Sequence, residues 1–162
     1  MKKFLTILLL LPAFLWGKPC SPPLLSLGGG YWMAGKRHSG GLIQAEYKWG
    51  CKWFRFLRPQ ACLVVPEFRA FFVGAGIGVE LYVTDHLVFS PHFSPGLYYG
   101  GKGKNLGCPL EFRSGVDFAY EFNNEMRLGT QFWHISNASI GCRNPGANAW
   151  SLYFAIPLKF CY

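Results

Sequence analysis

The sequence lacks several features that would place it in a common class of proteins. It carries only 8 acidic residues against 16 basic ones, and no acidic residue follows Glu125. Its 6 cysteines include no C-x-x-C pair, the spacing typical of structural zinc sites. Beyond Trp16, no apolar run is long enough for a transmembrane helix. A zinc-stabilised module and a helical membrane protein are therefore disfavoured.

The N-terminal residues predict that the chain is exported. Lys2 and Lys3 precede an apolar run, Phe4–Trp16, which is too short to span a bilayer comfortably. We interpret residues 1–17 as a signal peptide and residues 18–162 as the exported domain. Without its two leader lysines the domain has 14 basic and 8 acidic residues, a net charge of about +6. Export disfavours nucleic acid as the partner, so we expect anionic lipid or lipopolysaccharide phosphates instead.

The cysteines all lie in the predicted exported domain. An even count of 6 in an oxidising compartment permits disulfide bonds. The sequence leaves their pairing open, and a mixture of free and paired thiols is equally compatible with it.

The hydrophobic residues follow a strict alternation. They make up 51% of the chain, which is high for an exported soluble domain of this size. In residues 110–122, LEFRSGVDFAYEF, every second side chain is apolar except Ser114. This period of 2 indicates a β-strand, and its length suits a tilted strand that crosses a membrane. The same pattern predicts strands at residues 24–35, 41–50, 56–65, 69–84, 87–99, 109–122, 125–137 and 149–162.

The lengths of the connections indicate how these strands are arranged. With both termini periplasmic, the short turns at Asp85-His86 and Asn123-Asn124 are periplasmic, and the longer loops around 100–108 and 139–148 are extracellular. A membrane strand must pair every backbone group, so the sheet has to close. We therefore predict an all-β fold, an eight-stranded antiparallel transmembrane β-barrel of the outer-membrane type. The alternative is a soluble eight-stranded barrel such as a lipocalin, and a filled interior disfavours a channel.

Polar residues on the inward faces predict an ion-pair network inside the barrel. His92 is expected to face the same interior in a packing role. The candidates for the network are Glu46, Glu80, Glu111, Arg113, Asp117 and Arg127.

Two polar residues stand on an apolar face near the end of the seventh predicted strand. Met126, Leu128 and Phe132 assign one face of this strand to lipid, and the alternation places His134 and Ser136 on that face. Polar groups that face lipid cost desolvation unless they are used. A histidine and a serine on one strand face form the base and nucleophile pair of acyl transfer. The bland alternative is that small polar residues merely tolerate the membrane interface.

The segment His134-Ile135-Ser136-Asn137-Ala138, followed by Asn144-Pro145-Gly146 and a terminal apolar strand through Pro157, resembles the lipid A 3-O-deacylase (PagL) family. The family's H-x-S-N-A signature is matched in full, and the resemblance is specific over about residues 126–162. These proteins are small outer-membrane β-barrel esterases that cleave the ester-linked acyl chain at the 3-position of lipid A. The resemblance implies the following roles: Ser136 as nucleophile, His134 as general base and then acid, and Asn137 and Asn144 as oxyanion-site residues through side chain or backbone N–H.

One position departs from the family pattern. The family's third catalytic member is a glutamate twelve residues after the serine, and here that position is Asn148. An asparagine can hold the imidazole tautomer, but it cannot stabilise the imidazolium by charge. The sequence thus leaves open a slow esterase and one that recruits an acid from elsewhere. It also leaves open a catalytically degenerate barrel that acts as an adhesin or envelope structural protein.

The resemblance also implies what the protein meets. The expected partner is lipid A, or lipopolysaccharide, in the outer leaflet of the outer membrane. No cofactor or metal is required by a serine mechanism, and a homodimer is left open. Lys102, Lys104 and Arg143 lie in the predicted extracellular loops, where they either meet lipid A phosphates or are solvated loop charges.

Overall fold

The computed structural model of the chain describes residues 21–54 and 56–158. The predicted signal peptide and the last residues of the final predicted strand lie outside the described residues. No helix in the described part is long and apolar enough to cross a membrane. The strands are β1 (Leu24–Met33), β2 (Gly40–Lys48), β3 (Leu57–Pro66), β4 (Phe71–Val79), β5 (Leu81–Tyr82), β6 (Leu87–Tyr99), β7 (Leu110–Glu121), β8 (Arg127–Ser136) and β9 (Ala147–Pro157).

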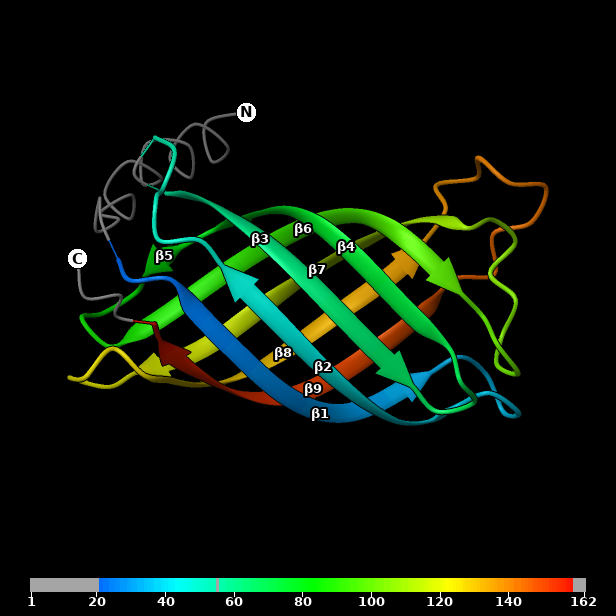
Figure 1. Cartoon of the computed structure of the whole chain (residues 1–162), viewed down its shortest axis with the longest axis horizontal. Coiled ribbons are helices and arrows are strands. Elements are labelled where there is room, and N and C mark those ends of the chain that lie inside the picture. Colours follow the sequence, from blue (N-terminus) through cyan, green and yellow to red (C-terminus); the bar gives the residue numbers. More distant parts are fainter. Residues whose placement is uncertain (1–20, 55, 159–162) are drawn as a thin grey trace, which may run out of the picture.

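The strands form one closed antiparallel barrel (Figure 1). Each long strand pairs with its sequence neighbours, β1 pairs with β9, and β4 pairs with β6. The short β5 pairs with β6 just after β4 does, so β4 and β5 together occupy one strand position. The barrel therefore has eight strands around its circumference. The predicted eight-stranded barrel is therefore confirmed.

The single strand predicted over residues 69–84 is interrupted at Glu80. Glu80 belongs to neither β4 nor β5, although its N–H still donates to the carbonyl of Phe56, 3.0 Å away, one pair beyond the β3–β4 pair of Leu57 and Val79. Its carboxylate is buried against three cations, which hold it inside the barrel. The alternation of the sequence continues through this break, so the period alone could not show it.

The two ends of the barrel differ as the connection lengths predicted. The N–H of Leu158 donates to the carbonyl of Pro23, 2.8 Å away, which places both ends of the described chain at one end of the barrel. The turns at 83–86 and 122–126 lie at this same end, and the loops at 100–109 and 137–146 lie at the other (Figure 1). Outer-membrane barrels have short periplasmic turns and longer extracellular loops, so we call the second end the loop end.

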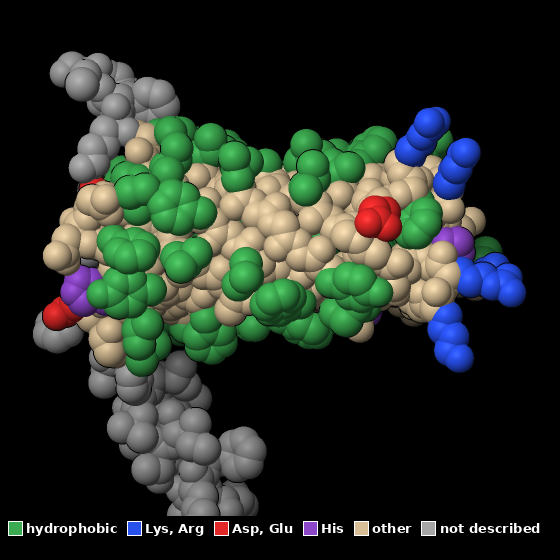
Figure 2. All heavy atoms as spheres, turned by 90° about the horizontal axis from the view of Figure 1, so that it is seen from below, with side chains coloured by type: hydrophobic (Ala, Val, Ile, Leu, Met, Phe, Trp, Pro, Cys, Tyr) green, Lys and Arg blue, Asp and Glu red, His purple; other side chains and the backbone are tan. Residues whose placement is uncertain are grey.

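The outer wall is apolar along its length. Figure 2 shows hydrophobic side chains over the wall and Lys and Arg side chains gathered at one end. Every second residue of the strands supplies this wall; examples are Leu27, Ile43, Phe118, Leu128, Phe132, Leu152 and Phe154. Such a wall is soluble only in a hydrocarbon environment, which favours the membrane barrel over the soluble one.

The interior contains the predicted ion pairs. Glu80 pairs with Lys52, Arg58 and Arg127 at 2.6–2.8 Å. A second group joins Lys48, Glu46, Arg113, Asp117 and His92. Glu111 is also buried, but it forms no ion pair within the described residues. The network prediction is thus confirmed except for Glu111.

Aromatic side chains fill the interior towards the loop end. Trp32 stacks on Tyr98 with ring centroids 6.3 Å apart, and it contacts Trp133 at 5.6 Å. The guanidinium of Arg113 lies 4.9 Å from the Trp133 ring and joins this aromatic cluster to the polar network. A barrel packed in this way supports the expectation that there is no open channel.

Candidate active site

Strand β8 carries the two polar residues of the sequence motif on its outer face. Trp133 and Ile135 are fully buried in the barrel interior, and they fix the direction of the residues between and beyond them. His134 is exposed and Ser136 is half-buried on the outside, on the same face as the exposed Phe132. The predicted lipid-facing orientation of His134 and Ser136 is confirmed.

The imidazole of His134 is held by the neighbouring strand. His134 pairs with Asn148 of β9 in the ladder, and the Nδ1 of His134 lies 2.8 Å from the Oδ1 of Asn148. An amide oxygen can only accept, so in this contact Nδ1 carries the hydrogen and Nε2 keeps a free lone pair. This tautomer is the one that a general base needs.

Gly146 positions the other end of the ring. A Cβ placed on Gly146 would lie 2.8 Å from the Cε1 of His134 and 3.1 Å from its Nε2. The paired register of β8 and β9 ends at Ile135 and Ala147, so Gly146 is the residue just before β9. Gly146 therefore lies against the Cε1–Nε2 edge of the imidazole. Within the described residues no hydrogen bond joins the two side chains, which stand two residues apart on one strand face, roughly 6.8 Å between backbones.

The loop before β9, residues 137–146, is held in place by a lysine of the other long loop, residues 100–109. The Nζ of Lys104 donates to the carbonyls of Pro145 at 3.2 Å and Gly146 at 2.7 Å. Partial burial in this contact lowers the pKa of Lys104. Gly146 has a φ of 51°, which a residue with a Cβ adopts only with strain. The Asn144-Pro145-Gly146 turn is thus fixed against the imidazole.

Asn137 has its donors engaged within the protein. Its side chain is fully buried and donates to the carbonyls of Leu106 and Arg143, at 2.9 Å and 2.8 Å. Its backbone N–H donates to the Oδ1 of Asn144 at 3.1 Å. In the same contact the Oδ1 of exposed Asn144 is an acceptor, and its Nδ2 has no hydrogen-bond partner in the described part of the chain. Of the two asparagines expected at the oxyanion, Asn144 therefore has the free donor.

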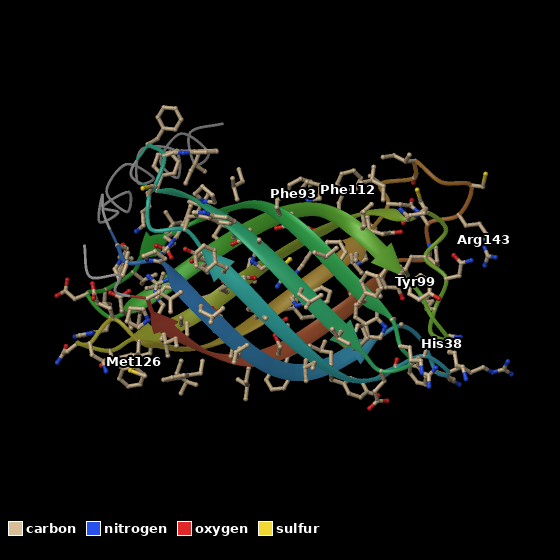
Figure 3. All side chains as sticks on the ribbon, in the orientation of Figure 1. His38, Phe93, Tyr99, Phe112, Met126 and Arg143 are labelled. Atoms are coloured by element: carbon tan, nitrogen blue, oxygen red, sulfur yellow. The ribbon has the colours of Figure 1, made fainter. Side chains whose placement is uncertain are left out.

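The other predicted loop residues divide into two groups. Lys104 is the clamp described above, whereas Lys102 and Arg143 are exposed. Figure 3 shows Arg143 extending from the loop end of the barrel. The described cysteines, Cys51, Cys62, Cys108 and Cys142, all carry free thiols.

No replacement acid stands beside the histidine. The ladder neighbours of His134 are Asn148 on β9 and Ser114 on β7. Among the described residues no carboxylate forms a hydrogen bond or an ion pair with the imidazole, and Asn148 is its partner. Ser114 was not predicted as a site residue, although it is the single polar residue on the apolar face of β7.

A closed eight-stranded barrel with an apolar wall is the architecture of an outer-membrane barrel, and this one carries a histidine, an asparagine and a serine on that wall near its loop end. The model of the family Lipid A 3-O-deacylase (PagL) matches residues 28–157, and the chain belongs to this family. Membership and fold together place the chain in the outer membrane.

Solved structures agree on the fold. The outer-membrane enzyme PagL superposes with a TM-score of 0.66 at 20% identity, over 83% of this chain and 99% of that one. A de novo designed transmembrane β-barrel gives 0.61 at 12% identity, over 88% and 99%. Neisserial surface protein A gives 0.59 at 10% identity, over 87% and 100%. No curated protein matches the sequence.

Proposed function

We propose that this protein hydrolyses the ester-linked acyl chain at the 3-position of lipid A, with Ser136 as nucleophile and His134 as base. The observation that carries the proposal is the 2.8 Å contact between His134 Nδ1 and Asn148 Oδ1 on the lipid-facing wall. It leaves Nε2 as a free acceptor on the strand face that also carries Ser136. The family description names the same reaction.

The reaction would proceed in two acyl-transfer steps. Nε2 of His134 takes the proton of Ser136 while Oγ attacks the ester carbonyl, and the resulting imidazolium gives that proton to the leaving sugar oxygen. Water then attacks the acyl-serine with Nε2 as base, which releases a fatty acid and restores Ser136. The site faces hydrocarbon at the level of the outer leaflet, so the membrane-embedded ester can reach it laterally.

Asn144 is the proposed oxyanion donor. Its Nδ2 is free, whereas the donors of Asn137 are engaged with Leu106, Arg143 and Asn144. Asn137 would act by holding Asn144 in place, since its backbone N–H binds the Oδ1 of that side chain. Removing one oxyanion donor typically costs about 10²–10³ in kcat. Asn148 would orient His134 without supplying a charge.

The test is mass spectrometry of lipid A from outer membranes that do or do not contain the protein. Loss of one acyl chain from the 3-position is expected with the wild-type chain. Ser136→Ala should leave lipid A intact while the barrel keeps its heat-modifiable migration on gels. A fully active Ser136→Ala variant would exclude this serine as the nucleophile.

A second function is favoured by one observation. The charge that stabilises an imidazolium is missing, because Asn148 is the partner of His134. A barrel that acts only as an adhesin or envelope structural protein predicts identical lipid A spectra with and without the folded chain. It also predicts that Ser136→Ala has no effect on any envelope phenotype.

A further inference from the structure

A second serine stands beside the site on the neighbouring strand. Ser114 lies on the exposed face of β7 and pairs directly with His134 of β8 in the ladder. Directly opposed side chains of an antiparallel pair have Cβ atoms about 4.5–5.5 Å apart. Ser114 is the one polar residue on this face of β7; Leu110, Phe118 and Tyr120 are exposed apolar residues of the wall.

The hydroxyl of Ser114 has no hydrogen-bond partner in the described part of the chain, although it faces hydrocarbon. Leaving a hydroxyl unpaired in an apolar medium is costly. Thr130, a hydroxyl on the outer face of β8, donates to the carbonyl of Ser151 at 3.1 Å. Unlike the hydroxyl of Thr130, the hydroxyl of Ser114 can therefore bond to a molecule from outside the protein.

Aromatic side chains lie beside Ser114, one across the ladder on β6 and one two residues away on β7. On β6 its ladder partner is Phe93, which is 46% exposed. Phe93 stacks on Phe112 with ring centroids 5.8 Å apart and planes 12° from parallel, and Figure 3 shows the two on the outer wall. A strip of wall therefore runs from His134 across Ser114 to Phe93, and Phe112 lies beside it, opposite Ser136. An alkyl chain on this strip would meet rings on one side and a single hydroxyl beneath.

The distance between Ser114 and the proposed nucleophile Ser136 determines which part of the substrate Ser114 can bind. Ser136 is opposite Phe112, so Ser114 is its diagonal neighbour, about 7–8 Å away, on the membrane side. An acyl chain attacked at Ser136 runs into the leaflet, and Ser114 lies on that side of the nucleophile. A carbonyl carbon about 3 Å from the serine oxygen, a C–C–C–O unit of roughly 3.6 Å and a hydrogen bond of about 2.8 Å together reach roughly 9 Å.

We propose that Ser114 is a specificity residue that binds the hydroxyl two carbons from the carbonyl of a 3-hydroxyacyl ester, which it recognises over the plain acyl ester. This inference rests on the proposed function and deepens it. The contact is equally available before and during the reaction, so it lowers KM and leaves kcat unchanged. One neutral hydrogen bond of this kind corresponds to a preference of about three- to tenfold.

The experiment compares two lipid A substrates that differ only in whether the 3-position chain is hydroxylated. Wild type should show the lower KM for the hydroxylated substrate, and Ser114→Ala should lose that preference with kcat unchanged. Ser114→Thr, which keeps a hydroxyl, should retain it. Thr130→Val is the matched control, because it removes a wall hydroxyl that is already bonded, and it should behave as wild type. A preference that survives in Ser114→Ala overturns the inference.

Binding separates this inference from the proposed reaction. Native mass spectrometry in the Ser136→Ala background measures retention of the same two lipids without turnover. Preferential retention of the hydroxylated lipid, lost on adding Ser114→Ala, supports the inference even if wild type hydrolyses neither substrate, an outcome that would refute the esterase alone. Equal retention of both lipids refutes the role of Ser114, whatever the rates are.

Discussion

Replacing Asn148 by aspartate should raise the esterase rate, because it adds the missing charge without moving the partner atom. Aspartate has the shape of asparagine, so its oxygen can keep the 2.8 Å contact with the Nδ1 of His134. The contact already fixes the tautomer, so the gain is the electrostatic stabilisation of the imidazolium alone. Asn148→Glu, which matches the family residue, adds one methylene and tests whether the ring can shift to accept a longer side chain.

The size of the gain follows from Coulomb's law. Two unit charges about 4 Å apart interact by about 1 kcal/mol in water and about 4 kcal/mol at an effective dielectric constant of about 20. His134 and Asn148 are both exposed on a wall that faces lipid, so their environment lies between these limits. The expected increase in kcat is therefore roughly 5- to 1000-fold. Replacing the acid by amide in a serine protease triad costs about 10⁴, because there the tautomer is lost as well.

The assay is release of fatty acid from purified lipopolysaccharide by the refolded barrel in detergent. Asn105→Asp is the matched control, since it adds the same charge at the loop end and keeps its acceptor for the N–H of Gly107. It should leave the rate unchanged. A folded Asn148→Asp variant that is no faster than wild type would show that the charge of this position does not limit the reaction. An increase that persists after adding Ser136→Ala would place the chemistry elsewhere.

Three further variants test the supports of the site and of the barrel. Gly146→Ala should lower kcat by at least about tenfold with the barrel intact, because a Cβ 2.8 Å from the Cε1 of His134 displaces the ring. Fatty-acid release measures the rate, and heat-modifiable migration on gels checks the fold. An unchanged kcat would contradict the prediction. Lys104→Met removes two donors to the loop before β9, so limited proteolysis of that loop should become faster and activity should fall about fivefold; equal cleavage rates would show that the clamp is dispensable. Glu80→Gln leaves three buried cations without their carboxylate and should lower the free energy of unfolding in urea by about 3–5 kcal/mol, with activity in the folded fraction unchanged; a loss below about 1 kcal/mol would mean that water reaches these cations.

The fold could be predicted from the sequence because it depends on one property, namely which side of the barrel wall each strand residue faces. A residue on a barrel strand faces either lipid or interior, and the alternation records that choice at every position from Leu110 to Glu121. The same rule correctly turned His134 and Ser136 outward. It did not show the break at Glu80 between β4 and β5, because the side-chain pattern continues through that residue. Contacts between loops, such as that of Lys104 with Gly146, follow no periodic pattern, so they could not be predicted from the sequence.

In the dipeptide Ser136-Asn137, the same alternation gives the two residues different roles. Ser136 faces the membrane as the proposed nucleophile, and Asn137 faces the interior, where it supports the site. Ser136 is the last residue of β8 and faces the membrane, so its neighbour must face the interior. There the side chain of Asn137 bonds the carbonyls of Leu106 and Arg143, which belong to the two long loops. An asparagine suits this position because its amide donates two hydrogens while its oxygen accepts the N–H of Ser139, which a charged or apolar side chain could not do. The asparagine of the motif thus ties both loops to the end of the strand that carries the serine, and Asn144 and Gly146 reach the site through it. Removing Asn137 should therefore displace the oxyanion donor and the imidazole together, so its effect on the rate should exceed that of removing Asn144 alone.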